Sequence, residues 1–191
     1  YRWPQLLPDN FNIIVSSSSL VSANNDSDII LYNASTGTYE TIIPNAYNAR
    51  FMAETGQIIF VRDSSLWGAP FDINELKIIG DESLLVKNIE TNGILGSAAY
   101  SFSRNGRLIY LSGNDVAAAS EDLKMDVLSR DGALIESLSI SGRFGQLSLS
   151  PSSNFLSYTK YDDSNADIWV YDFEQKISGR RTFDGASDRP R

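Results

Sequence analysis

Two residue types that many enzymes use in catalysis, histidine and cysteine, are absent from this 191-residue chain. Their absence excludes thiol catalysis, disulfide bonds, zinc sites of the usual Cys/His kind and every triad with an imidazole base. Enzymatic chemistry would therefore fall mainly to the 24 carboxylates. A glycosidase needs two of them across one pocket, and nothing in the sequence selects a pair. No catalytic residue is predicted.

The acidic segment 162–167 superficially resembles a calcium-binding loop. An EF-hand-like loop needs a glycine at its sixth position and a distal glutamate, whereas Ala166 and Asp167 lead straight into an apolar strand. The glycine-containing segment 142–145 lacks the lysine and the following helix of a phosphate-binding loop. We therefore predict no metal site and no cofactor.

The elements that must carry these residues are short apolar runs separated by Gly, Asn, Asp, Ser and Pro, a pattern typical of β-strands joined by turns. Four runs show no alternation of apolar and polar residues: 29–32, 58–61, 108–111 and 168–171. Because successive side chains of a strand point to opposite faces, such strands must be covered on both faces. The best helical candidate, 116–124, is too short to cover a sheet. Sheets packed against sheets are therefore predicted.

One short sequence pattern occurs four times along the chain: an apolar residue, which we call the anchor, then a tight turn, then a second apolar residue six positions after the anchor. The turn contains Gly or Asn, which tolerate the left-handed conformation that a tight hairpin requires. The anchors lie 45, 50 and 47 residues apart, and the second residues are expected to be among the most buried. The anchors are Leu7, Met52, Phe102 and Leu149, and the second residues are Ile13, Ile58, Leu108 and Phe155.

Each unit has a second half in which two further strands follow, as in 28–43 and 167–183. Four antiparallel strands per unit, at a period of about 47 residues, predict an all-β fold of the β-propeller type with four blades. An immunoglobulin-like sandwich has no reason to repeat itself four times. The expected blades are 1–45, 46–96, 97–142 and 143–187, in a single domain, and 188–191 are expected to start a further repeat.

Three segments carry a more specific pattern. In 4–14 and 149–158 a proline-containing turn precedes an apolar strand, and in 167–172 a strand begins with Asp-Ile and has a tyrosine three residues later. Such units resemble the TolB-like, or WD40-like, β-propeller repeats of bacteria. The Gly-His and Trp-Asp pairs of true WD40 repeats do not occur. The resemblance implies a sensor-type or interaction propeller and favours a periplasmic or other extracytoplasmic location.

Acidic residues gather in the loops that would join the second and third strands of the blades, which lie together on one face of a propeller. These loops contain most of the net charge of −8. An acidic rim would attract a basic ligand, such as a cationic protein surface, a peptide or a metal ion; the alternative is the ordinary use of Asp in exposed turns. The expected binding residues are Asp26, Asp28, Asp115, Glu121, Asp122, Asp162, Asp163 and Asp167.

Three functions follow from these patterns. The first is a non-enzymatic module that binds a protein or another ligand through a propeller face. The main alternative is the accessory propeller of a prolyl-oligopeptidase-like hydrolase whose catalytic domain lies elsewhere, and a carboxylate-dependent glycosidase comes third. The excess of 24 acidic over 16 basic residues argues against nucleic acid. No apolar run reaches the roughly 18 residues of a membrane span, so no membrane contact is expected.

The number of blades bears on the oligomeric state. Closed propellers usually have more than four blades of this type, although four is the low end of the range. An open arc of four would leave two apolar sheet faces uncovered, which soluble proteins rarely tolerate as large patches. A homodimer whose copies cover each other's faces is therefore expected, with tight closure of four blades as the alternative.

Overall fold

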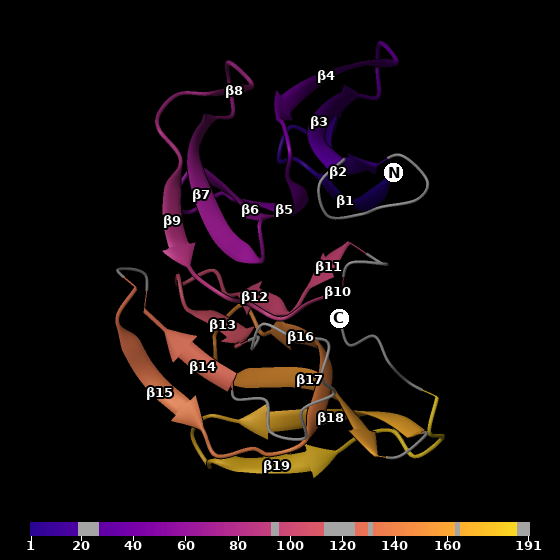
Figure 1. Cartoon of the computed structure of the whole chain (residues 1–191), viewed down its shortest axis with the longest axis vertical. Helices are drawn as coiled ribbons and strands as arrows, with labels where there is room; N and C mark the ends of the chain where they lie inside the picture. Colours follow the sequence, from indigo (N-terminus) through magenta and orange to yellow (C-terminus); the bar gives the residue numbers. More distant parts are fainter. Residues whose placement is uncertain (19–26, 93–95, 113–124, 130–131, 163–164, 187–191) are drawn as a thin grey trace. The chain divides into compact units, whose positions relative to one another are not determined.

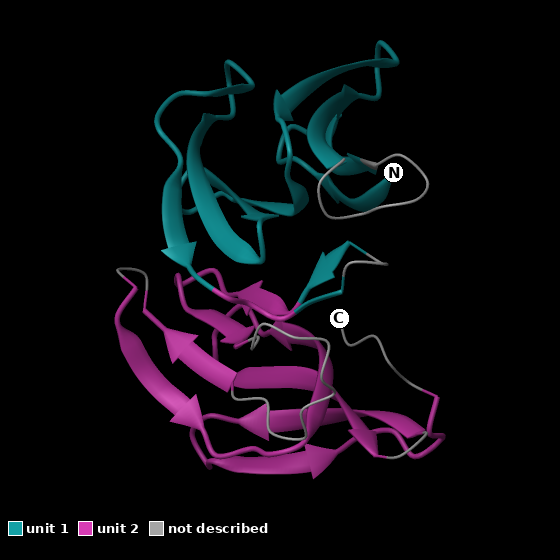
Figure 2. Cartoon of the chain, in the orientation of Figure 1, with its two compact units in different colours: residues 1–87, 91–98 teal, residues 88–90, 99–191 magenta. Residues whose placement is uncertain are grey.

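The computed structural model describes residues 1–18, 27–92, 96–112, 125–129, 132–162 and 165–186. These residues form strands and turns, and none of them is helical. The chain divides into two compact units (Figure 2), the first containing residues 1–87 and 91–98 and the second 88–90 and 99–191. The helical candidate 116–124 lies outside the described residues.

Unit 1 contains two larger antiparallel sheets and a short hairpin (Figure 1). Blade 1 consists of β1 (Arg2–Leu6), β2 (Asn12–Ser18), β3 (Ser27–Asn33) and β4 (Thr38–Ile43). Blade 2 consists of β5 (Tyr47–Met52), β6 (Gln57–Arg62), β7 (Ser65–Asp72), β8 (Lys77–Ile78) and β9 (Ser83–Val86), the last two both pairing with β7. The hairpin is β10 (Thr91–Asn92) and β11 (Ser97–Ala98).

Unit 2 contains two sheets of four antiparallel strands each. Blade 3 consists of β12 (Tyr100–Phe102), β13 (Leu108–Leu111), β14 (Met125–Leu128) and β15 (Leu134–Leu138). Blade 4 consists of β16 (Arg143–Leu149), β17 (Phe155–Asp162), β18 (Asn165–Asp172) and β19 (Ile177–Arg180). In every blade the first four strands follow chain order across the sheet, and in blade 2 the fifth strand, β9, also pairs with β7. The predicted all-β, propeller-type fold with four blades is confirmed.

A left-handed residue closes the first turn of three blades at the same position, three residues after the start of the turn. It is Asn10 in blade 1, Gly106 in blade 3 and Ser153 in blade 4, with φ angles of 63°, 86° and 62°. Each donates its N–H to the carbonyl three residues earlier. Asn and Gly tolerate this conformation well, whereas serine rarely adopts it. The sequence therefore predicted the turn but not which residue of blade 4 would be strained.

The expected buried residues were wrong by one position in three blades. Ile58 is fully buried as expected, but Phe155 is 47% exposed, while Leu156 is 0% exposed. Likewise Ile14 and Ile109 are fully buried, instead of their half-buried neighbours Ile13 and Leu108. Two adjacent apolar residues stand at each of these sites, so periodicity alone could not choose between the faces of the strand. A shift of one residue moves every side chain to the other face.

Each unit has a core between its two blades. In unit 1 the aliphatic residues of β2 and β3 meet Phe51, Phe60 and Phe71 of blade 2, with the rings of Phe51 and Phe71 edge to face at 5.7 Å. In unit 2 the rings of Phe144 and Tyr158 make the same kind of contact, also at 5.7 Å. The two blades of each unit therefore bury facing sheet surfaces against each other.

A polar contact between first strands accompanies each core, and we call it the blade lock. In unit 1 the side chain of Gln5 donates to the carbonyl of Phe51 (3.2 Å) and accepts from its N–H (2.7 Å). In unit 2 the Ser101 hydroxyl accepts from the N–H of Leu149 (2.9 Å). Gln5 and Ser101 occupy equivalent positions, and so do Phe51 and Leu149. The lock therefore gives partners to backbone groups at the sheet edge that would otherwise be buried and unpaired.

The finding that Leu156, and not Phe155, faces the core can be tested with a matched pair of variants. Replacing Leu156 with Ala removes a fully buried side chain from the core of unit 2. We expect a loss of about 2–5 kcal/mol in the free energy of unfolding, measured by urea titration. Phe155→Ala, which truncates a larger but half-exposed side chain at the adjacent position, should cost less than about 1 kcal/mol. A larger cost for Phe155→Ala would contradict the assigned phase.

The turn of blade 1 predicts a pH dependence. Burial alone would raise the pKa of Asp9, but hydrogen bonds from Asn12 and Phe11 hold it below its ordinary value. A carboxyl with a lowered folded-state pKa stabilises the fold above its unfolded-state pKa, and this contribution disappears as the pH falls through the folded-state value. Asp9→Asn should therefore lower the melting temperature at pH 7 and have little effect near pH 2. An undiminished difference at the acidic end would contradict this cause.

Candidate functional site

The structure describes three of the eight acidic residues predicted to line a binding rim. Asp26, Asp115, Glu121, Asp122 and Asp163 lie outside the described residues. Asp28 is in unit 1, where its carboxylate accepts from the N–H of Asn45 at 3.0 Å. Asp162 and Asp167 are in unit 2, near the end of β17 and the start of β18. Only this pair can be examined as one site.

Asp167 has its carboxylate occupied by groups of its own chain. Its residue exposure is 6%, and it accepts from Arg180 Nη2 at 2.6 Å, Thr182 Oγ1 at 3.1 Å and the N–H of Gly185 at 3.4 Å. The Thr182 hydroxyl in turn accepts from the N–H of Ile168 at 2.9 Å. A buried carboxylate with an ionic partner and two further donors is well compensated for the loss of water. Asp167 thus serves as a structural clamp.

The clamp fixes the segment 181–186 along β18. The N–H of Arg181 donates to the carbonyl of Ile168 at 2.8 Å, and that of Ala166 donates to the carbonyl of Gly185 at 2.9 Å. The hairpin itself pairs Asp162 with Asn165 in regular register. This part of blade 4 is therefore an ordinary hairpin with segment 181–186, which we call the strap, bound along β18. No group of three or more acidic residues able to hold a metal ion occurs among the described residues.

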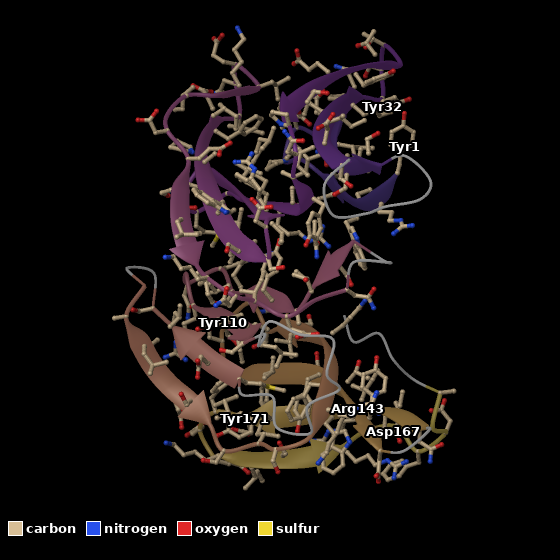
Figure 3. The ribbon with its side chains drawn as sticks, in the orientation of Figure 1. Tyr1, Tyr32, Tyr110, Arg143, Asp167 and Tyr171 are labelled. Atoms are coloured by element: carbon tan, nitrogen blue, oxygen red, sulfur yellow. The ribbon has the colours of Figure 1, made fainter. Side chains whose placement is uncertain are left out.

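Cations paired with aromatic rings surround the same hairpin, and we call this region the hairpin end of blade 4. Arg143 lies over the ring of Tyr161 (5.9 Å), Lys160 over Trp169 (5.2 Å) and Arg180 over Phe183 (4.9 Å), each distance running to the ring centre. Figure 3 shows Arg143 and Asp167 at this end of the sheet and Tyr171 farther along it.

A glycine allows the close approach of β16 to Tyr161. A Cβ at Gly145 would lie only 2.8 Å from the Tyr161 hydroxyl and 3.1 Å from Thr159. Segment 142–145 does not have the sequence of a phosphate-binding loop. Its glycine instead makes room for the ring over which Arg143 lies, and the sequence signal that could have indicated this is the Gly-Arg-Phe-Gly pattern at a strand start.

A cluster of hydroxyls between blades 3 and 4 offers no catalytic group. Ser153 Oγ lies 2.6 Å from Ser103 Oγ and 2.5 Å from Asn105 Oδ1, and both serines are buried. No side chain that could act as a general base takes part in these contacts. The hydroxyl cluster is therefore a structural link.

The Glu90 carboxyl is the other candidate acid. Burial raises its pKa, but no second carboxyl is placed beside it in the described contacts.

No family model matches the sequence, and no curated protein does either. Solved structures do. TolB from Acinetobacter baumannii matches 92% of this chain with a TM-score of 0.67 and 12% identity. A putative TolB from Agrobacterium tumefaciens matches 95% with a TM-score of 0.68 and 13% identity.

The chain has the TolB-like β-propeller fold. It spans 42% of the Acinetobacter protein and 61% of the Agrobacterium one. A puromycin hydrolase structure is also similar, over 93% of this chain and 28% of the hydrolase, with a TM-score of 0.62 and 13% identity. At such identities the TolB-like fold is shared, whereas function has to be argued from the residues themselves. The described part of this propeller has no helix with the length and apolar character of a membrane span.

The clamp of the TolB-like propeller can be tested by proteolysis. Asp167→Ala should release segment 181–186, at a cost of about 1–3 kcal/mol, and speed tryptic cleavage after Arg180 and Arg181 several-fold. Asp162→Ala removes an exposed carboxylate from the same hairpin and should leave the cleavage rate unchanged. Mass spectrometry of timed digests measures both. Equal rates for the two variants would show that Asp167 does not hold the strap.

Proposed function

We propose that this propeller is a non-enzymatic interaction module that binds a protein partner through the hairpin end of blade 4. The observation that supports it most is the contrast between two kinds of group. The buried hydroxyls of Ser103 and Ser153 bond to each other, and the Asp167 carboxylate bonds to Arg180. In contrast, Arg143 and Phe183 present a cation and an aromatic ring to solvent. Phe183 is 76% exposed.

The contacts around Phe183 favour recognition because they are fixed before any partner arrives. Arg180 is held at once by the Asp167 carboxylate, by the carbonyl of Thr182 (2.8 Å) and against the Phe183 ring. Side chains already ordered lose less conformational entropy on binding. Arginine and aromatic residues are also enriched in protein interfaces and among the residues that dominate binding energy.

The chemistry of the partner follows from these side chains. A guanidinium pairs with carboxylates, and an exposed ring with another apolar or aromatic side chain. We therefore expect a protein surface that combines acidic and aromatic residues. The acidic rim predicted from the sequence calls instead for a basic ligand, and Asp167, one of its members, would have to leave its clamp to contribute.

The likeness to puromycin hydrolase supports a second candidate. In it, this chain would be the propeller portion of a hydrolase whose catalytic residues lie in another part of a longer protein. The chain alone would have no turnover under either proposal. A hydrolase domain in the same polypeptide would favour the second candidate over the first.

We also propose an extracytoplasmic location, for which the TolB-like fold is the support. Fractionation of the native cells, followed by immunodetection, tests this part of the proposal. Recovery of the protein only with cytoplasmic markers would contradict it.

Binding can be measured by fluorescence anisotropy with two labelled peptides, one alternating Glu and Tyr and the other alternating Lys and Tyr. At about 0.15 M salt, charges farther away than roughly 8 Å are largely screened, so the local site decides the affinity. We expect the acidic peptide to bind and the double variant Arg143→Ala/Phe183→Ala to weaken it at least tenfold, as the loss of central contacts does.

The matched control is Lys77→Ala/Ile79→Ala, which removes one exposed cation and one exposed apolar side chain from unit 1. It should leave the affinity unchanged. Preferential binding of the basic peptide would favour the acidic rim instead. Turnover of an ester, peptide or glycoside substrate that is abolished by replacing one carboxylate would overturn the non-enzymatic proposal.

A further inference from the structure

Asn105 and Gly106 form an Asn-Gly pair in the turn between β12 and β13 of blade 3 (Figure 1). Asparagine is most prone to deamidation when glycine follows it, because glycine has no side chain to keep its backbone nitrogen away from the asparagine amide carbon. The sequence has one other such pair, Asn92-Gly93. Asn105 is exposed, so the reaction at this site needs no other molecule than water.

The reaction takes place in two stages. The backbone nitrogen of Gly106 attacks Cγ of Asn105, the bond from Cγ to Nδ2 breaks, and Nδ2 leaves as ammonia with the proton of the attacking nitrogen. A cyclic succinimide remains. Water then opens the ring at either carbonyl and returns a proton to the Gly106 nitrogen. Opening at Cγ gives aspartate, and opening at the backbone carbonyl gives isoaspartate, in which the chain continues through Cγ.

The folded turn occupies both reacting groups. The N–H of Gly106 donates to the carbonyl of Ser103 at 3.1 Å. Asn105 Oδ1 accepts from the hydroxyls of Ser103 and Ser153, each at 2.5 Å. Asn105 Nδ2 donates to the carbonyl of Ser152 at 3.4 Å. Before Gly106 can attack, the amide must leave these partners and the hydrogen bond of the turn must open, so the fold protects Asn105.

Two of the protecting groups come from blade 4, and one of them belongs to a strained residue. Ser153 is fully buried, and its φ of 62° lies in the left-handed region that serine rarely adopts. Such a conformation persists only where the surroundings hold it. The Ser153 hydroxyl reaches both Asn105 and Ser103. The left-handed backbone thus accompanies a hydroxyl that holds the turn of blade 3.

We propose that Asn105 is a deamidation site controlled by Ser153 of the neighbouring blade. The amide stays intact while blade 4 holds it, and it is converted when the turn of blade 3 separates from Ser153. Deamidation is much slower than the opening and closing of a turn, so its rate follows the equilibrium population of the open turn. Because ammonia departs, each conversion is a permanent record of one opening.

Neither product restores the contact between the blades. In aspartate an oxygen replaces Nδ2, so the carbonyl of Ser152 loses its donor. In isoaspartate the backbone of the turn is one carbon longer, and the spacing between the Ser103 carbonyl and the N–H of Gly106 changes. The carboxylate then also extends from a different atom and no longer meets Ser153. Deamidation therefore acts as a one-way switch at the contact of blades 3 and 4.

Ageing the folded chain in mildly alkaline buffer tests the proposal, with the chain unfolded in guanidinium chloride as the reference. Mass spectrometry of chymotryptic peptides measures conversion at Asn105 and at Asn92, and enzymatic methylation detects isoaspartate. In the unfolded chain both residues should convert at similar rates. In the folded chain Asn105 should convert about tenfold more slowly or less, because opening gives up several hydrogen bonds. Equal rates for folded and unfolded Asn105 would overturn the proposal.

Variants of two adjacent serines identify the controlling group. Ser153→Gly removes the hydroxyl and relieves the left-handed backbone, so it should speed conversion of Asn105 about two- to tenfold, as the loss of one hydrogen bond does. Conversion of Asn92, in unit 1, should keep its rate. The matched control is Ser152→Ala, which keeps the carbonyl and removes a hydroxyl 3.5 Å from Ser150 Oγ; it should change neither rate. An unchanged rate at Asn105 in Ser153→Gly would overturn the control by Ser153.

The switch itself is tested on the aged chain. Ion exchange separates the converted forms, and Asn105→Asp supplies the aspartate form directly. Both forms should melt below the parent chain, and the isoaspartate form should melt lowest because its backbone is altered as well. An isoaspartate form with the melting temperature of the parent would show that the contact survives conversion, and this result would overturn the switch.

Discussion

A blade of this protein is a twisted antiparallel sheet that cannot bury its own faces, and the rest of the structure depends on how the next blade covers them. In each unit the second blade supplies aromatic residues to the face of the first. The same contact must satisfy the edge of the first strand, whose alternate peptide groups have no partner within the sheet. The blade lock provides that partner with a side chain, and it therefore couples apolar burial to backbone hydrogen bonding at a single point.

The period, the strands and the fold class could be predicted from sequence because each depends on local pattern. Turn residues, apolar runs and the spacing of anchors all pointed to blades. Which of two adjacent apolar residues faces the core depends instead on what covers each face, so Phe155 was preferred to Leu156. The left-handed Ser153 could not be predicted either, since Asn154 is the better candidate by residue type.

The candidate site shows the same division between local and non-local information. Aspartates near a turn could be found in the sequence. The partner of Asp167, however, is Arg180 on the next strand, and the register of β18 and β19 that brings the two together is known only from the folded structure. Once the ion pair is known, a residue counted as part of an acidic rim becomes an internal clamp. Arg143 was overlooked because its role depends on Tyr161, which lies opposite it only when β16 and β17 pair.

The low identity of 12–13% to TolB structures is understandable from these requirements. A blade needs apolar residues of suitable size on two faces, a turn that tolerates one left-handed residue, and an acceptor that reaches the edge N–H of the next blade. Gln5 meets the last requirement with two hydrogen bonds and Ser101 with one, so the position is defined by what it reaches rather than by its residue type. The strand ends are under no such requirement. The hairpin end of blade 4 is therefore free to carry its own arrangement of cations and rings while the sheet beneath it stays the same, and this freedom allows one fold to serve unrelated functions.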